Sequence, residues 1–332
     1  MSVRIGINGF GRIGRYATRI LAQSGQLDLV AINARADNES LAHLLKYDSV
    51  HGPFSGSVQA DEQGLTVNGK HIDVTRKSPG EWTWGELGVD IVLETTGKFK
   101  NRTQCQPHLD GGARKVLISA PSKDCDLSVV MGVNDHELKP EHTIVSNASC
   151  TTNCLAPAVK VVHENFGLLR GSMTTVHSYT MTQRILDGSH KDLRRARAAA
   201  MSMIPTSTGA AQAVADVIPE LQGKLDGMAI RVPTPNVSLV DLSADLNCSV
   251  SGQEVNAALQ AASENQLKNI LGYSEEPLVS VDYVGSIYGG VVDALTTTVT
   301  DGSLLKLIVW YDNEAGFTHQ LLRLAEKTAQ ML

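Results

Sequence analysis

The stretch "VRIGINGFGRIGRYATRILAQSG", residues 3–25, decides the fold because its hydrophobic period changes part-way along. Residues 3–9 mix short apolar runs with glycines, as a buried parallel strand does. Residues 12–25 then show helical spacing, and Gly25 is expected to end the helix. The apolar positions of that helix are Ile13, Ala17, Ile20 and Leu21. With "LDLVAIN" at 27–33 as a second strand, the stretch predicts one βαβ unit.

The turn between this strand and helix carries the glycine pattern of a dinucleotide site, Gly9-x-Gly11-x-x-Gly14. Gly9 would allow the tight turn, Gly11 the approach of backbone to a pyrophosphate, and Gly14 the packing of helix on strand. The helix N-terminus would supply N–H groups and partial positive charge to the phosphate. A glycine turn with a purely structural role is the alternative.

The end of the second strand bears on the choice of cofactor. An acid is expected there if the cofactor is NAD, but this chain has Ala34 and Arg35. An arginine would attract a 2′-phosphate and so favours NADP. Asp37 could still reach the ribose hydroxyls, and Arg35 could equally be exposed without a ligand.

Strands and helices continue to alternate up to about residue 149, which predicts a doubly wound parallel sheet of the Rossmann type. Its later strands are expected at 90–97, 115–121 and 142–149. Beyond this point the pattern changes to long β-rich runs with alternation, which favour an antiparallel or mixed sheet. These runs fall at 171–180, 229–246 and 304–312, and helices are expected at 154–167, 251–266 and 317–332. The fold class is therefore α/β with a second α+β domain, divided into 1–149 and 150–314.

Composition narrows the class of protein. The chain has 332 residues, enough for two domains, and a net charge of −6, which argues against a non-specific nucleic-acid binder. No apolar run approaches the roughly 18 residues of a membrane helix, and the first residues lack the pattern of a signal peptide. Five cysteines form a poor disulfide framework and favour a reducing compartment. We therefore expect a cytoplasmic protein, or a mature plastid enzyme whose transit peptide has been removed.

"SNASCTTNCLAP", residues 146–157, contains the cysteines most suited to chemistry. Cys150 follows a predicted strand and begins a predicted helix, where a thiolate is stabilised and its pKa lowered. Cys154 lies one turn further along and is expected to be less exposed. A metal site, a disulfide and an inert buried thiol are the alternatives, and the spacing lacks the partners of a zinc site. His177, at the end of a predicted strand, is the candidate base for Cys150.

Several motifs together resemble the phosphorylating glyceraldehyde-3-phosphate dehydrogenases, from residue 2 to the C-terminus. They are "INGFGRIGR", "LLKYDSVHG", "SNASCTTNCLAP", "IPTSTGAA", "RVPTPNVS" and "WYDNEAGF". The resemblance implies that Cys150 attacks the aldehyde of glyceraldehyde 3-phosphate and that His177 acts as base. Inorganic phosphate would then release 1,3-bisphosphoglycerate from a thioester. Erythrose-4-phosphate dehydrogenase, a close relative, is the alternative.

The resemblance also implies two phosphate sites. The site for the substrate phosphate would use Thr180, Thr182 and Arg231, with Arg195 near its path. The site for the attacking phosphate would use Ser149, Thr151, Thr208, Gly209 and again Arg231. Hydroxyls, an amide and a guanidinium are suitable phosphate ligands. Without the resemblance, "TSTG" could be a plain turn and Arg231 a surface ion pair.

Further cofactor contacts are implied in the same way, at Gly9, Gly11, Arg12, Ile13, Ala34, Arg35, Lys77, Thr96, Gly97, Ser119, Ser189 and Asn313. The last helix, 315–332, would return to the cofactor domain, and the chain would assemble as a homotetramer. The loop "LDGSHKDLRRARAAA" is similar to that of the NADP-using photosynthetic members, in which a serine matching Ser189 approaches the 2′-phosphate from a neighbouring subunit. We expect NADP to be preferred, or both NADP and NAD to be used, in a gluconeogenic, Calvin-cycle or glycolytic reaction.

Overall fold

The computed structural model describes residues 2–332, which form two compact units. The first unit comprises the residues up to Val129, Asp135–Ala148 and Leu321–Leu332. The second comprises Val130–Asn134 and Ser149–Gln320. The expected boundary after residue 149 lies one residue from this division. The C-terminal helix α6 (Ala315–Ala329) does not belong to the first unit as a whole, because the division falls between its residues Gln320 and Leu321.

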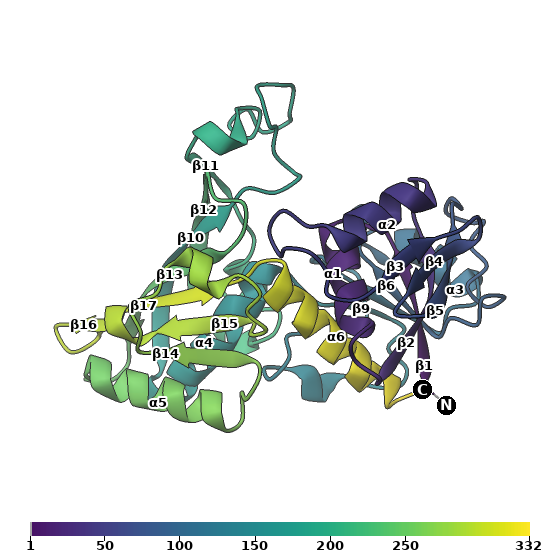
Figure 1. Ribbon diagram of the computed structural model, residues 1–332. Coiled ribbons are helices and arrows are strands. Elements are labelled where there is room, and N and C mark those ends of the chain that lie inside the picture. Colours follow the sequence, from purple (N-terminus) through teal and green to yellow (C-terminus); the bar gives the residue numbers. More distant parts are fainter. Residues whose placement is uncertain (1) are drawn as a thin grey trace. The chain divides into compact units, whose positions relative to one another are not determined.

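The first unit is built on a nine-stranded sheet with the order β3-β4-β5-β2-β1-β6-β7-β9-β8 (Figure 1). All neighbours pair in parallel except β3 with β4 and β4 with β5. The strands are β1 (Val3–Asn8), β2 (Leu27–Asn33), β3 (Val58–Ala60), β4 (Gly64–Val67), β5 (Lys70–Thr75), β6 (Ile91–Glu94), β7 (Lys115–Ile118), β8 (Leu127–Ser128) and β9 (Ile144–Ser146). This confirms the predicted doubly wound sheet.

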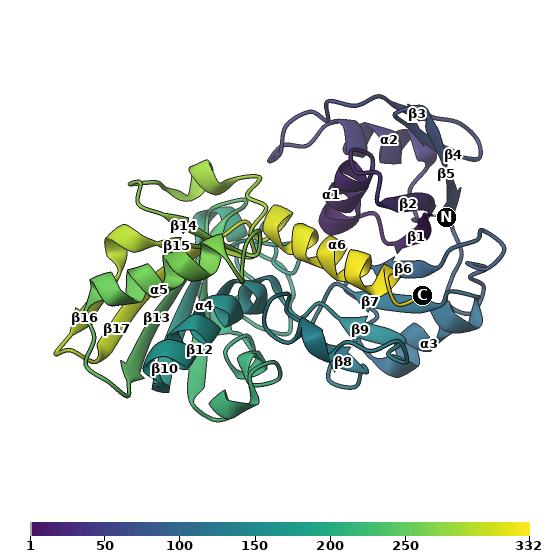
Figure 2. The ribbon, with the colours of Figure 1, turned by 90° about the horizontal axis from the view of Figure 1, so that it is seen from below.

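Three helices connect the parallel strands of the first unit. They are α1 (Arg12–Leu21), α2 (Asn38–Lys46) and α3 (Arg102–Asp110), with α1 and α2 side by side in both ribbon views (Figures 1 and 2). The strand order reverses at β1, because β2 pairs with one side of β1 and β6 pairs with the other. The carboxyl ends of β1 and β6 therefore form the topological switch point, where open α/β sheets bind ligands.

The first turn uses its three glycines in three different ways. Gly9 has φ +99°, a left-handed conformation that side chains rarely adopt. A Cβ at Gly14 would lie 2.2 Å from the carbonyl oxygen of Gly9, so helix and turn could not keep their contact. A Cβ at Gly11 would meet nothing within 4 Å, which leaves that backbone open to a ligand. The expectation for Gly25 was wrong: the helix ends at Leu21.

The second unit contains a mixed sheet with the order β11-β12-β10-β13-β17-β15-β14, and β16 pairs with β17. Helices α4 (Cys150–Phe166) and α5 (Gly252–Glu264) contact each other and cover one face of it (Figure 2). As predicted, α4 ends at Gly167, which has φ +68°. The strands are β10 (Leu168–Ser178), β11 (Ile204–Ser207), β12 (Leu225–Val232), β13 (Ser238–Leu246), β14 (Leu271–Ser274), β15 (Gly290–Asp293), β16 (Thr298–Thr300) and β17 (Leu304–Tyr311).

The apolar run 229–246 is two strands rather than one, because "PTPNV" at 233–237 interrupts β12 and β13. Proline cannot donate to a ladder, so the chain leaves the sheet there. Within residues 2–332, no helix has the length and apolar character that a membrane span requires.

The glycine turn predicts a contrast between two alanine variants. Gly14→Ala should lower the free energy of unfolding by about 1–3 kcal/mol, because the new methyl overlaps backbone. Gly11→Ala should change it by less than about 0.5 kcal/mol, because the space is open. Urea denaturation of both variants measures the difference, and equal midpoints would contradict this account of the turn.

Candidate active site

Cys150 and His177 lie together in the second unit. Cys150 is the first residue of α4, and the side chain of the preceding Ser149 caps this helix by accepting a hydrogen bond from the N–H of Thr152. His177 is near the carboxyl end of β10 and is only 4% exposed. The Sγ of Cys150 lies 3.6 Å from Nε2 of His177. The proposed nucleophile and base are thus within contact distance, as a thiol–imidazole pair requires.

Arg231 reaches the same pair from the neighbouring strand. His177 on β10 is the register partner of Arg231 on β12, so their side chains leave the sheet side by side. Nη1 of Arg231 lies 2.9 Å from Nδ1 of His177 and donates to the carbonyl of Ser178 at 2.9 Å. Arg231 is therefore no surface ion pair, and its charge lies next to the catalytic candidates.

The surroundings of this site favour the neutral forms of the His177 imidazole and the Cys150 thiol. Burial, with a further contribution from the charge of Arg231, lowers the pKa of His177 from 6.5 to about 3. Burial raises the pKa of the Cys150 thiol, although Arg231 and the hydrogen bonds of Thr151 act in the opposite direction. The expectation that the helix N-terminus lowers the thiol pKa was wrong for this structure, because desolvation outweighs these opposing effects.

Cys154 takes no part in this pair. It is fully buried, its Sγ donates to the carbonyl of Val309 at 3.6 Å, and burial raises its pKa well above 9. All five cysteines are free thiols. Among residues 2–332, no group of three or more His, Cys, Asp or Glu side chains is placed to hold a metal ion.

The candidate phosphate ligands are in the same unit but are not equally available. The hydroxyls of Thr180 and Thr182 lie 2.8 Å apart, and Gly209 is exposed. Thr151 is 4% exposed and its hydroxyl bonds to Tyr311, while the hydroxyl of Ser149 serves the helix cap. For these two residues, the groups best placed for a phosphate are the backbone N–H groups at the start of α4.

The other basic and hydroxyl candidates already have protein partners. Nε of Arg195 donates to the hydroxyl of Thr206 at 2.9 Å and lies 3.6 Å from Asp192. The hydroxyl of Thr208 accepts from the N–H of Ala210 at 3.2 Å. Arg195 therefore brings less net charge to a phosphate than Arg231 does.

A cavity of about 320 Å³ lies at the switch point of the first unit. It is lined by six of the expected cofactor residues, Gly9, Gly11, Ala34, Arg35, Lys77 and Thr96. Its wall also carries the cations Arg76 and Lys98 and no carboxylate. An open glycine backbone at the start of a helix and a cationic wall fit a dinucleotide.

Asp37 does not supply the missing acid. Both of its carboxylate oxygens bond to Ser40, one to the N–H at 2.8 Å and the other to the hydroxyl at 2.7 Å, so Asp37 caps α2. The hydrogen bonds from Ser40 lower its pKa. The alternative in which Asp37 serves the ribose therefore loses support, since both oxygens are engaged.

The remaining cofactor candidates lie outside the wall of the cavity. The Arg12 guanidinium is engaged by Asp48, with Nη2 and Oδ1 3.0 Å apart. Oδ1 of Asn313 accepts from the hydroxyls of Ser178 and Ser238 at 2.8 and 3.0 Å, which leaves its amide N–H groups facing away from these serines. The others outside the wall are Ile13, Gly97, Ser119 and Ser189, the last of which is exposed in the loop after β10.

Sequence reasoning missed several residues of the cavity wall. These are Asn8, Phe10, Asn33, Arg76, Ser78, Pro79, Trp82, Thr95, Lys98 and Phe99. Asn8 and Asn33 could have been found, because they end the two strands of the βαβ unit. Trp82 and Phe99 carried no such signal, since their segments reach the cavity only through the fold.

Comparison with known proteins agrees with this arrangement of a dinucleotide-binding unit and a thiol site. Residues 3–102 match the family model described as glyceraldehyde 3-phosphate dehydrogenase, NAD binding domain. Residues 149–313 match the model for the C-terminal domain of the same enzyme. The two units thus define a dehydrogenase with a domain for a nicotinamide dinucleotide.

Curated relatives match along the whole chain. The glyceraldehyde-3-phosphate dehydrogenase of Geobacillus stearothermophilus is 58% identical over 98% of this chain and 98% of that protein. Glyceraldehyde-3-phosphate dehydrogenase 1 of Bacillus subtilis is 55% identical over 99% of both chains, and glyceraldehyde-3-phosphate dehydrogenase 2 of a Nostoc species is 51% identical over 99% of both. The chain belongs to the glyceraldehyde-3-phosphate dehydrogenase family.

The position of Arg231 predicts how the thiol titrates. Its charge lowers the pKa of both Cys150 and His177, so Arg231→Gln should raise both pKa values. The rate of Cys150 alkylation by iodoacetamide should then rise at a higher pH than in the wild type. Arg170→Gln, on the exposed side of β10, serves as control and should leave the profile in place. An unshifted profile for Arg231→Gln would show that its charge does not act on the thiol.

Proposed function

We propose that the protein catalyses the reversible oxidative phosphorylation of D-glyceraldehyde 3-phosphate to 1,3-bisphosphoglycerate, using NADP or NAD. The observation that carries this proposal is the 3.6 Å contact between Cys150 and His177, with Arg231 beside it. The names of the relatives and the two family matches support the same reaction.

In this reaction Sγ of Cys150 attacks the aldehyde carbon and forms a C–S bond, and the thiol proton passes to the carbonyl oxygen. His177 then takes the hydroxyl proton of this hemithioacetal on Nε2 as the hydride leaves its carbon. The bound nicotinamide cofactor supplies the hydride acceptor. The product is a thioester on Cys150, which inorganic phosphate attacks, so that the C–O bond forms and the C–S bond breaks.

His177 suits the role of base because it is neutral in this environment. Its low pKa means that the imidazole is free to accept a proton at any pH well above about 3. Its Nδ1 lies 2.7 Å from the carbonyl of Ser178, which fixes the ring and stabilises the imidazolium that forms. The N–H of Cys150 at the helix start would stabilise the oxyanion.

The phosphate groups of the reaction need cationic and hydroxyl ligands. We assign the substrate phosphate to Thr180, Thr182 and Arg231, with Arg195 on its path. The attacking phosphate would bind at the start of α4 near Ser149 and Thr151, with Thr208, Gly209 and Arg231. When Arg231 binds a phosphate, its charge is offset and its lowering effect on the pKa of His177 weakens.

NADP is the preferred cofactor in this proposal, with NAD as a second substrate. The cations Arg35, Arg76 and Lys77 in the cavity wall support this preference, because a 2′-phosphate needs cationic ligands, and Asp37 is held by its helix cap. A carboxylate at position 34 would repel that phosphate, and this chain has alanine there.

The same proposal includes a homotetramer. The loop between β10 and β11, at the upper end of Figure 1, exposes six large apolar side chains. They are Met181, Ile185, Leu186, Leu193, Met201 and Met203, with exposed fractions from 72% to 91%. Apolar side chains so exposed together are typical of a surface that another subunit covers. Ser189 of this loop would then approach the cofactor of a neighbouring copy. The proposal also includes a cytoplasmic location and a reaction that runs in the biosynthetic direction.

Initial rates with and without inorganic phosphate test the reaction. Glyceraldehyde 3-phosphate should be turned over only when phosphate is present, because the thioester needs it as acceptor. Cys150→Ser should abolish turnover, and His177→Asn should lower kcat by about 10²–10⁴-fold. Faster turnover of erythrose 4-phosphate, independent of phosphate, would assign the protein to the alternative activity.

Cofactor preference has its own test in Ala34→Asp. The wild type should show a higher kcat/KM with NADP than with NAD, and the new carboxylate should lower kcat/KM for NADP at least about tenfold. The kcat/KM for NAD should stay equal or rise. A wild type that uses NAD far better than NADP would refute the NADP preference while leaving the thiol chemistry intact.

A further inference from the structure

Glu94 is a buried carboxylate that the proposed reaction does not use. It ends β6 at the switch point, opposite Asn8 at the end of β1, and is 1% exposed. Its oxygens accept from four donors: Nδ2 of Asn8 at 2.5 Å, Nε2 of His108 at 3.2 Å, the N–H of Thr96 at 2.8 Å and the hydroxyl of Thr96. An acceptor-only group surrounded by donors is the arrangement of an ionised carboxylate.

The proton of His108 can be assigned from its other neighbour. Nε1 of Trp84 lies 2.9 Å from Nδ1 of His108, and an indole nitrogen can only donate. Nδ1 must therefore accept, so the ring is neutral and its proton is on Nε2. His108 is fully buried, and its ring stacks on Trp82 at 3.8 Å with an interplanar angle of 5°. His108 thus donates to Glu94 in one fixed orientation.

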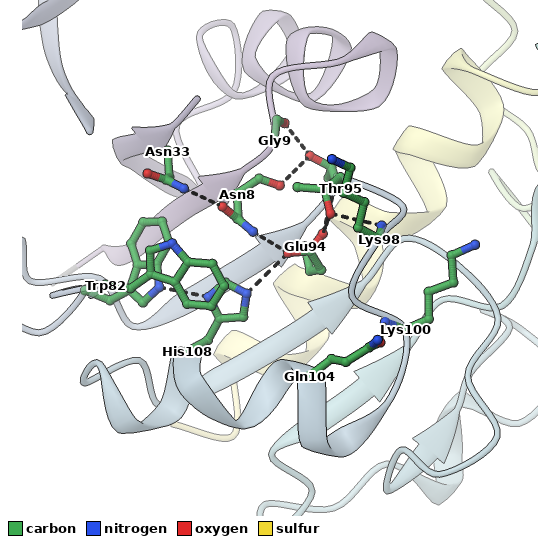
Figure 3. A network of polar contacts seen from close by, with 12 residues as sticks. Asn8, Gly9, Asn33, Trp82, Glu94, Thr95, Lys98, Lys100, Gln104 and His108 are labelled. Carbon is green, nitrogen blue, oxygen red and sulfur yellow. Dashed lines mark hydrogen bonds and ion pairs between the residues drawn. The ribbon is translucent and has the colours of Figure 1, made fainter. Parts of the chain in front are cut away.

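The hydrogen bonds of Glu94 continue through Asn8 and Asn33 to residues that line the cofactor cavity (Figure 3), and each bond fixes the donor and acceptor of the next. Asn8 donates to Glu94, so its Oδ1 is left to accept from Nδ2 of Asn33 at 2.8 Å. Oδ1 of Asn33 in turn accepts from the N–H of Lys77 at 2.9 Å. Nε1 of Trp82 donates to the carbonyl of Lys77 at 3.2 Å, and the Trp82 ring stacks on His108, so the circuit returns to His108 through a stacking contact. Asn8, Asn33, Lys77, Trp82 and Thr96 all line the cavity.

We propose that Glu94, held by His108, is a positioning residue of the cofactor site, because its carboxylate sets the orientation of the Asn8 and Asn33 amides and the Lys77 backbone. This inference rests on the proposed function, since it assumes that the cavity binds a nicotinamide dinucleotide. Glu94 acts through its neighbours and touches no reacting atom.

An amide in place of Glu94 cannot satisfy this circuit. In one orientation the NH₂ of a glutamine faces two donors, Asn8 and His108. In the other it faces the backbone N–H of Thr96, which lies in the cavity wall and cannot reverse, although the Thr96 hydroxyl can turn to accept. If Asn8 reverses its amide, its NH₂ meets that of Asn33. If Asn33 also reverses, its NH₂ meets the N–H of Lys77, which is backbone and cannot reverse. The mismatch therefore ends in the wall of the cavity.

The test is the binding of NADP and of NAD to the protein in the absence of the aldehyde substrate, measured by isothermal titration calorimetry. Glu94→Gln should weaken binding of the preferred cofactor about tenfold, as one buried mismatched hydrogen bond would. The KM for inorganic phosphate should stay within about twofold, because its ligands are in the other unit. Glu326→Gln, which replaces another carboxylate of the first unit, is the matched control and should bind as the wild type does.

A compensating variant separates positioning from a merely structural role. Asn8→Asp with Glu94→Gln moves the acceptor one position along the circuit and presents an oxygen to Asn33. A mismatch then remains only at His108, which does not line the cavity, so most of the lost affinity should return. If Glu94→Gln does not fold, Trp84→Phe replaces it. That variant removes the donor that holds the His108 ring in place, so the hydrogen bond from His108 to Glu94 weakens, and the cofactor affinity should fall about threefold.

These outcomes separate a failure of the positioning role from a failure of the proposed function. Wild-type affinity in folded Glu94→Gln or in Trp84→Phe, or a double variant no better than the single one, would overturn the positioning role alone. A wild type that binds neither nucleotide would overturn the proposed function and the positioning role with it.

Discussion

The contact between Cys150 and His177 is the interaction on which the proposed chemistry depends, and the second sheet positions His177 for it. His177 comes from the carboxyl end of β10, and its register partner on β12 brings Arg231 beside it. Cys150 lies beside His177 because α4 begins at this residue, directly after the Ser149 cap. A thiol, an imidazole and a guanidinium thus come from three separate segments, each held by backbone hydrogen bonds that do not depend on the site. Burial favours the neutral forms of the thiol and the imidazole, because it raises the pKa of Cys150 and lowers that of His177.

Both units place functional groups at strand ends and buried polar groups behind them. In the first unit the glycine turn leaves backbone open at Gly11, while Glu94 and His108 lie behind the cavity wall. In the second, Tyr311 is buried behind the thiol and bonds to Thr151 and Thr175. Burying a polar group costs stability unless its partners are satisfied, so such networks also restrict the site to one arrangement.

Much of this arrangement could be predicted from the sequence. The βαβ unit, the parallel sheet, the end of α4 at Gly167 and the pairing of Cys150 with His177 all follow from local patterns or from the resemblance. The end of α1 at Leu21 rather than Gly25 could not be predicted, because Ala22 and Gln23 are both good helix formers. The raised thiol pKa escaped prediction for a related reason: local sequence shows a helix start, whereas desolvation depends on every neighbour brought by the fold. The circuit from His108 to Lys77 joins residues whose proximity only the tertiary structure defines.

The most direct test of the central claim is peptide mass spectrometry of the protein mixed with glyceraldehyde 3-phosphate and NADP in the absence of phosphate. We expect an acyl adduct on the peptide that carries Cys150, formed with one equivalent of reduced cofactor and lost when inorganic phosphate is added. Steady reduction of the cofactor with no adduct, or an adduct on Cys154 or another residue, would contradict it.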